Sequence, residues 1–395
     1  MYRKFFLGTK GLNIREVGDF KYIIEDAFGV CSLPFASARH DELIISSYKM
    51  ARTIPLIGQD DSIFLEPDFD SKYWFELEKY YAAKLSDYYR IWQCGRLNYM
   101  KYDCLMSLIP SGYIDCGYGE GTKHILEFIH QKTINSIQNE KFPLTKIFLN
   151  IRLMHLQLIR VCSDLLSVLQ RALSAFKDLL FCQRQAIKTQ SWAIDLLETN
   201  ETIHTGPISY NVATAATIAV ISLCTSLDLS SKLIHFINDS KVPIDKFKSA
   251  HGKHFSDLIK IKEYVLSKHE LNTIKDIWNE LPSIKSLIQF RHDLIHNTSA
   301  LELEKLYVGR ATEEICGLPM HYSFQPWRDC EDNGQPIRYL GREYFVSSGI
   351  DFEKQLCDWL VDVIKGHLKV GEILFNIISE RADKSNFNVE LENLH

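Results

Sequence analysis

The chain has 395 residues, of which 46% are hydrophobic and 24% charged, so it carries enough apolar side chains for the core of a globular protein. This length favours two or three domains. The formal net charge of -5 excludes a protein that coats nucleic acid non-specifically, so binding of RNA or DNA would require a local basic site.

The cysteines and the apolar runs indicate the cellular compartment. The ten cysteines are scattered without a Cys-x-x-Cys pair, which is typical of reduced thiols and lacks the ligand spacing of a zinc ribbon. Polar residues interrupt the N-terminal apolar stretch too early for a signal peptide. The most apolar run, residues 212–224, is shorter than the ~20 residues of a membrane span. We therefore expect a soluble, cytoplasmic protein with no membrane contact.

Residues 1–140 form the first predicted region, which is α+β or helical and has no assigned role. Up to about residue 70, short apolar pieces alternate with turn-rich breaks. Residues 71–102 predict helices in which aromatic residues interleave with lysines and arginines. This pattern favours two helices with an aromatic core face, and the alternative is a stacking platform for single-stranded nucleic acid. The glycine-rich residues 112–121 lack a phosphate-loop motif and predict a turn.

Residues 141–204 predict a long helical segment that packs on the C-terminal domain. No proline or glycine interrupts residues 144–198, and apolar residues recur there in steps of three and four. Such a stripe favours an intramolecular core, with a partner helix in a dimer as the alternative. Gly206-Pro207 marks the junction with the next region.

Residues 205–385 predict a mainly α C-terminal domain, a bundle with long helices, which is followed by a flexible tail at residues 386–395. Helices are expected at residues 211–238, 255–267 and 271–281, in a further helix that starts at Pro282, and from Asp351 to about residue 380. A short β-hairpin is expected near residues 336–347. Asp228, Lys232 and His235 share one face of the first helix, which is expected to be solvated or to face the later motif.

One segment of this domain concentrates chemistry, the run Arg291-His292-Asp293-Leu294-Ile295-His296. Arginine binds phosphate through two parallel hydrogen bonds, and histidine titrates near neutral pH, so these side chains suit phosphate binding and proton transfer. Arg291 is expected on the buried stripe of its helix, together with five apolar residues: Ile284, Leu287, Ile288, Leu294 and Ile295. A guanidinium on an apolar face needs a carboxylate, a phosphate or a cleft.

The run from Arg291 to His296 fits the R-x4-H pattern and resembles the HEPN superfamily, all-α domains many of which are RNA-cleaving toxins or defence nucleases. The resemblance covers roughly residues 205–385, with residues 141–200 as a candidate extension, and it includes long helices before the motif and a closing helix after it. It implies an endoribonuclease that uses no metal and no cofactor, in which the 2′-hydroxyl of RNA attacks the adjacent phosphodiester. It also implies a toxin or antiviral effector, with a regulatory partner or antitoxin as a possible restraint.

By this resemblance Arg291 and His296 are the catalytic pair. Arg291 would bind the scissile phosphate and stabilise its developing charge, and His296 would act as general base or acid. Four further residues are expected to support them, by positioning RNA, by ending the helix or by facing Arg291: His292, Asp293, Asn297 and Asp228.

The spacing of the catalytic pair sets a geometric requirement. Residues five apart lie ~140° apart around a continuous helix, so Arg291 and His296 of one chain do not converge on one phosphate. Either the helix ends at His296, which Asn297 permits, or the motifs of two chains line one cleft. We expect a homodimer with the active site at its interface, as in HEPN nucleases generally. Regulation through a tyrosine two residues after the histidine is not expected, because that position is Thr298.

The same segment is compatible with two other functions. His292 and His296 have metal-ligand spacing, and with Asp293 they read His-Asp-x-x-His, close to the His-Glu-x-x-His of zinc proteases. Aspartate reaches less far than the glutamate of that motif, and Glu313 or Glu314 would have to supply a third ligand. The other alternative is a non-catalytic RNA- or protein-binding module, in which the charged residues form an ion-paired helix surface.

Overall fold

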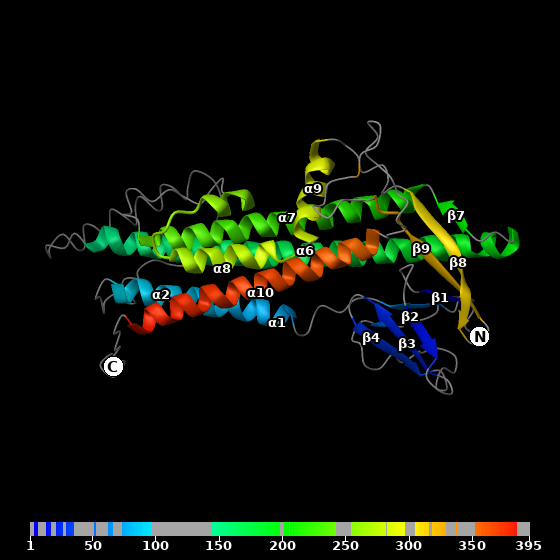
Figure 1. Ribbon diagram of the computed structural model, residues 1–395, viewed down its shortest axis with the longest axis horizontal. Coiled ribbons are helices and arrows are strands. Elements are labelled where there is room, and N and C mark those ends of the chain that lie inside the picture. The colour runs from blue at the N-terminus through cyan, green and yellow to red at the C-terminus, as the bar shows by residue number, and fades with distance from the viewer. Residues whose placement is uncertain are drawn as a thin grey trace. The chain divides into compact units, whose positions relative to one another are not determined.

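The computed structural model describes the following residues: 4–6, 13–16, 21–26, 29–34, 51–52, 62–65, 73–96, 144–197, 201–204, 206–241, 254–281, 283–296, 305–315, 318–328, 337 and 352–384. Within these residues the protein is mainly α, as the sequence predicted (Figure 1). The predicted turn at 112–121 and the tail at 386–395 lie outside them, as does the predicted hairpin near 336–347 apart from Ile337.

The helices include three long ones that were expected from apolar periodicity. They are α6 (Leu144–Leu197), α7 (Pro207–Asn238) and α10 (Phe352–Lys384). The shorter helices are α1 (Tyr73–Glu78), α2 (Leu85–Arg96), α8 (Lys268–Asn279) and α9 (Ser283–His296). A π-helical stretch, η1 (Lys79–Lys84), joins α1 to α2, and 3-10 turns occur at η2 (Asp239–Lys241) and η3 (Phe255–Lys260). α7 begins directly after the junction predicted at Gly206-Pro207, where Gly206 has a φ of 141°.

The strands form two sheets. One has six strands in the order β5-β6-β1-β9-β8-β7, and the other has the order β2-β3-β4. The bounds are β1 (Lys4–Phe6), β2 (Asn13–Glu16), β3 (Lys21–Asp26), β4 (Gly29–Pro34), β5 (Ala51–Arg52), β6 (Ser62–Leu65), β7 (Glu201–His204), β8 (Leu306–Ile315) and β9 (Leu318–Phe324). β1 pairs in parallel with both β6 and β9, whereas β8 and β9 form an antiparallel hairpin.

The described residues group into two compact units made of interleaved segments. Unit 1 comprises Met1–Phe75, Ser167–Leu227 and Asp276–Gly366, and unit 2 comprises Glu76–Leu166, Asp228–Lys275 and His367–His395. The helices α6, α7 and α10 therefore each contribute to both units. The domain boundaries predicted at residues 140, 204 and 385 stay predictions.

Unit 2 has a core of aromatic residues from the helices α1 to α2, which Figure 1 draws beside the end of α10. Tyr81, Tyr89 and Trp92 are at most 4% exposed, which confirms the core interpretation of these residues. The Tyr81 hydroxyl donates a 2.7 Å hydrogen bond to the backbone carbonyl of His367 on α10. A Cβ at Gly371 would lie 2.9 Å from the Tyr81 ring, so this close approach requires glycine.

Asn238, at the end of α7, holds the segment that follows η3 through three hydrogen bonds. Its side-chain oxygen accepts the backbone amides of Tyr264 and Leu266, at 3.3 and 3.1 Å, and its nitrogen donates to the Lys262 carbonyl at 2.6 Å. The predicted helix at residues 255–267 is therefore wrong beyond residue 260, because a buried amide from α7 takes up these backbone groups.

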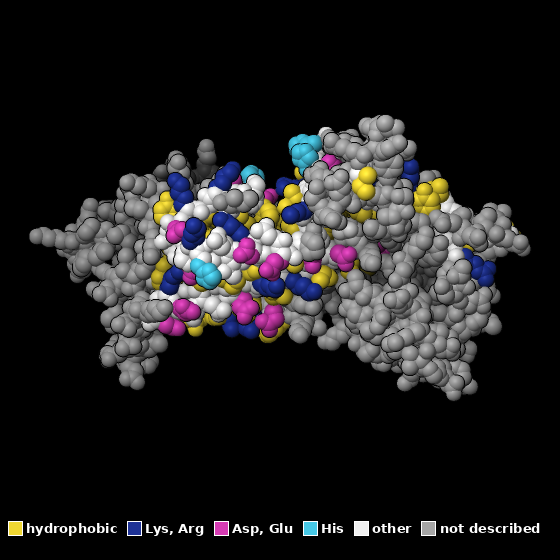
Figure 2. Space-filling view, viewed as in Figure 1, with side chains coloured by type: hydrophobic (Ala, Val, Ile, Leu, Met, Phe, Trp, Pro, Cys, Tyr) yellow, Lys and Arg dark blue, Asp and Glu magenta, His cyan; other side chains and the backbone are white. Residues whose placement is uncertain are grey.

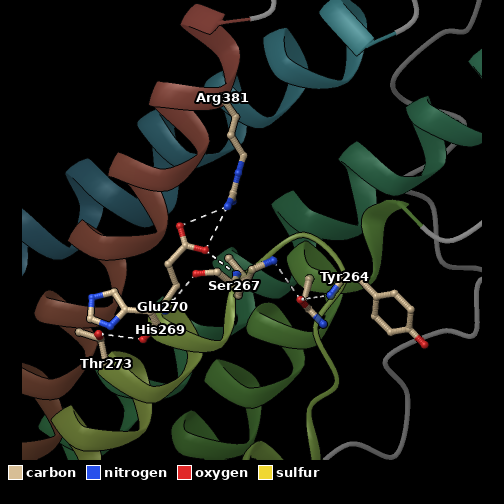
Figure 3. A network of polar contacts seen from close by, with 8 residues as sticks. Tyr264, Ser267, His269, Glu270, Thr273 and Arg381 are labelled. Carbon is tan, nitrogen blue, oxygen red and sulfur yellow. Dashed lines mark hydrogen bonds and ion pairs between the residues drawn. The ribbon is translucent and has the colours of Figure 1, made fainter.

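The start of α8 is fixed by its capping residues (Figure 3). Ser267 Oγ accepts the Glu270 amide at 3.3 Å, and the Glu270 carboxylate accepts the Ser267 amide at 2.6 Å, which is a capping box. The same carboxylate pairs with Arg381 of α10 at 3.0 Å. α8 therefore starts three residues before the predicted Leu271.

α7 is long and apolar enough to cross a membrane by length and composition alone, the one such helix among the described residues. However, 61% of its most apolar window is buried inside the protein, which explains its composition as that of a core helix. Cys162, Cys182, Cys224 and Cys357 are free thiols. Burial raises the pKa of Cys162 to about 12, so this thiol is a core side chain and not a nucleophile.

Candidate functional site on helix α9

The inner face of α9 packs into the core of unit 1. Its buried residues are Ser283, Ile284, Leu287, Phe290 and Asp293. The ring of Phe290 lies in an aromatic cluster with Trp327, Phe352 and Trp359, with centroid distances of 4.6, 5.7 and 5.7 Å. The helix runs across the long helix α7, and the Cys224 thiol of α7 contacts the Leu287 carbonyl (Figure 1).

The phase of this buried face differs from the predicted stripe. Ile288 and Ile295 are 38% and 51% exposed, so the expectation that these two lie on the buried face is wrong, whereas Arg291 is half-buried. Phe290 sets the phase, because its ring fills the centre of the aromatic cluster, and the position one turn further on is Asp293. Asp293 is therefore the polar residue of this motif that is buried in the core of unit 1.

Asp293 forms a buried ion pair with Arg328. The Arg328 Nη2 lies 2.7 Å from Asp293 Oδ2, and the two side chains are 0% and 6% exposed. The guanidinium carbon also lies 5.0 and 5.2 Å from the ring centroids of Phe290 and Trp327, which is within cation–π range. Gln289 donates a 3.3 Å hydrogen bond to the other carboxylate oxygen. Asp293 therefore anchors α9 in the core, a role that the sequence analysis did not assign.

A sequence signal for this pair existed. Asp293 follows Phe290 by three residues, so it lies ~60° from Phe290 around the helix, at the border of the apolar face. A carboxylate that is buried there needs a cation, and Arg328 directly follows Trp327 beyond the end of β9. The two residues are far apart in the sequence, which is why periodicity alone did not pair them.

The outer face of α9 carries the two histidines. His292 and His296 are exposed, and their ring centroids lie 4.6 Å apart at an interplanar angle of 48°. Figure 2 shows histidine side chains gathered over the C-terminal end of this helix. Lys285 is exposed on the same helix, and Asp293 is the one acidic residue among those of α9. Because its carboxylate points inward, the exposed part of α9 bears basic and neutral side chains.

The described structure brings His292, and not Arg291, to the same face as His296. Arg291 and His296 both belong to the continuous helix α9, so they are separated by ~140° around its axis. Arg291 lies half-buried at the edge between the inner and outer faces. Asn297 lies outside the described residues.

Asp228, the remaining predicted site residue, belongs to unit 2. Its carboxylate accepts the Phe255 amide at 2.8 Å and lies 3.9 Å from His254 Nδ1, so it holds the start of η3. His235, one of its predicted neighbours on a solvated face, is only 6% exposed, so that expectation is wrong for this residue. In unit 2 Asp228 thus has a structural role.

Of the residues described, no group of three or more His, Cys, Asp or Glu side chains could hold a metal ion. The side chains of Glu313 and Glu314, the predicted third ligands of a zinc site, lie outside the described ones.

Comparison with protein-family models, curated proteins and solved structures found no match to this chain. The fold and the site define a mainly α protein with one helix whose acidic side chain is buried and whose exposed face carries paired histidines.

Proposed function

We propose that the protein is a metal-independent endoribonuclease of the HEPN type, which works in the cytoplasm as a homodimer. The observation that supports this best is the division of α9 into two faces. Its carboxylate is paired with Arg328 inside the core, while His292, His296 and Lys285 are exposed. A phosphodiester can approach such a surface without meeting a negative charge on the helix.

The exposed histidines supply the proton transfers that RNA cleavage needs. In this proposal His296 takes the proton of the 2′-hydroxyl while that oxygen forms a bond to phosphorus. The bond from phosphorus to the 5′-oxygen breaks, and a protonated imidazole gives a proton to the leaving oxygen. The products are a 2′,3′-cyclic phosphate and a free 5′-hydroxyl. Arg291 neutralises the charge that develops on the phosphate oxygens.

A dimer follows from the position of the arginine on the helix. Arg291 lies at the edge of the outer face and His296 on that face, so one helix presents them in different directions. Two α9 helices related by a twofold axis would bring the arginine of one chain toward the histidine of the other. The role that fits such an enzyme is that of a toxin or antiviral effector, which a regulatory partner or antitoxin would hold inactive.

The test is cleavage of RNA by the purified full chain in the presence of EDTA. Wild-type protein should cut RNA and leave cyclic phosphate ends, and Arg291→Ala and His296→Ala should each abolish cutting. His269→Ala is the matched control, because it removes an exposed histidine from a different helix, α8. Activity that disappears in EDTA, or that survives His296→Ala, would refute the proposal.

A second candidate is a non-catalytic RNA-binding module, and the separation of Arg291 from His296 on one helix favours it. The same basic face would then bind phosphates without assembling a catalytic pair. Binding of RNA that weakens in Lys285→Ala, with no cleavage by wild-type protein at any concentration, would establish this function in place of the nuclease.

A further inference from the structure

The two histidines of α9 form an arrangement that the nuclease proposal does not require. His292 and His296 are one helical turn apart, both are exposed, and their ring centroids lie 4.6 Å apart. Imidazole nitrogens on rings at this separation can reach a single ion, because zinc and similar metals bind such nitrogens at about 2.0–2.1 Å. No acidic residue of α9 competes for the imidazoles, since the Asp293 carboxylate is buried with Arg328.

We propose that His292 and His296 together bind one divalent transition-metal ion of the Zn²⁺, Ni²⁺ or Cu²⁺ class. Neutral imidazole is a ligand that these ions share, whereas Mg²⁺ and Ca²⁺ take oxygen ligands and would not bind here. Water completes the coordination, because the described residues offer no third donor group at this position. The site is thus a two-histidine clamp on the protein surface and not a catalytic metal centre.

Contacts on the inner face of α9 hold the helix backbone that carries the two histidines. Ser283 donates a hydrogen bond to the Asp362 carboxylate, and the indole of Trp359 donates to Ser286 at 2.9 Å. With the Asp293–Arg328 pair, these contacts fix the helix backbone from its first turn to its last. Holding the two histidines on a fixed backbone lowers the ordering cost of chelation, and such preorganisation strengthens binding.

A bound ion would restrain the chemistry of the same face. A metal on the His296 imidazole occupies the nitrogen that would otherwise take or give a proton, so the occupied site would not cleave RNA. This consequence rests on the proposed nuclease function, but the binding itself does not. EDTA would then preserve or raise nuclease activity, which is the reverse of its effect on a zinc hydrolase.

The experiment is a calorimetric titration of the full chain with Ni²⁺, chosen because it prefers imidazole to the thiolates of this cysteine-containing chain. Five proteins are compared: wild type, His292→Ala, His296→Ala, the double variant and His269→Ala. We expect each single variant to weaken one binding event by on the order of tenfold or more, since a chelate loses its second ligand. The double variant should lose little beyond either single variant, and His269→Ala should bind as wild type does.

Two results would overturn the clamp. One is an unchanged Ni²⁺ isotherm in both single variants, and the other is two independent losses that simply add in the double variant. Because the titration contains no RNA, a chain that binds Ni²⁺ through these residues but cuts no RNA disproves the nuclease alone. A chain that cuts RNA in EDTA but binds Ni²⁺ regardless of these residues disproves the clamp alone.

Discussion

Replacing Asp293 by alanine should destabilise unit 1 strongly. The change leaves the Arg328 guanidinium, which is 0% exposed, without the carboxylate that lies 2.7 Å away. Removing one partner of a buried ion pair costs about 3–5 kcal/mol, because the other charge remains in a region of low dielectric. The rings of Phe290 and Trp327 offset part of this penalty through cation–π contact, so we expect about 3 kcal/mol.

The assay is urea unfolding followed by tryptophan fluorescence, for which Trp327 and Trp359 lie beside the pair. A double-mutant cycle with Arg328→Met separates the pair from the loss of each side chain. The double variant should be more stable than the sum of the single losses by about 2 kcal/mol or more, because it removes both members of this ion pair together. His292→Ala is the control on the same helix and should change stability by about 0.5 kcal/mol or less.

A cost below about 1 kcal/mol for Asp293→Ala, or a cycle in which the two changes simply add, would show that the buried ion pair does not stabilise unit 1 in this way. The result also decides how activity data on this motif are interpreted. If the prediction holds, any loss of activity in Asp293→Ala follows from loss of the fold and says nothing about proton transfer. Arg291 and His296, which do not share this buried position, are the residues whose substitution tests the chemistry.

Three further predictions concern stability, all measured by urea unfolding. Burial lowers the pKa of His367 to about 3. Below pH ~6.5 the unfolded chain therefore binds a proton at this histidine that the folded chain does not. Between pH 7 and pH 5 the free energy of unfolding of wild type should fall by about 2 kcal/mol more than that of His367→Gln. Equal losses would contradict this. Gly366→Ala should cost about 1–3 kcal/mol, because its Cβ would lie 2.3 Å from the Trp278 ring; unchanged stability would count against that contact. Asn238→Ala should lower the free energy of unfolding by about 2 kcal/mol, because backbone groups of residues 262–266 lose their hydrogen-bond partner. A negligible change would mean that water replaces the side-chain amide.

The sequence predicted well those elements whose apolar pattern repeats along many turns. α6, α7 and α10 each carry a long periodic stripe, so their existence followed from local sequence and their ends from a few breaking residues. The helical character of residues 73–96 and the burial of Tyr81, Tyr89 and Trp92 followed for the same reason.

The predictions that were wrong concern positions whose structure depends on a residue far away in the sequence. Residues 261–267 are not helical because Asn238, more than twenty positions earlier, takes their backbone amides. The buried phase of α9 was misjudged because Phe290 and Asp293 gain their partners from Trp327 and Arg328, in a stretch without regular periodicity. At the candidate site, the sequence placed Arg291 and His296 in one helix, but only the fold revealed which face is basic and exposed.

The central claim is that two copies of α9 combine to cut RNA, and mixing two inactive variants tests it most directly. Arg291→Ala and His296→Ala chains are unfolded together, refolded and assayed on RNA in EDTA, with each variant refolded alone as the control. The mixed sample should regain cleavage, because a heterodimer contains an intact Arg291 from one chain and an intact His296 from the other. If wild-type protein cuts RNA but the mixture stays as inactive as its components, the two residues do not combine across a dimer and the account is contradicted.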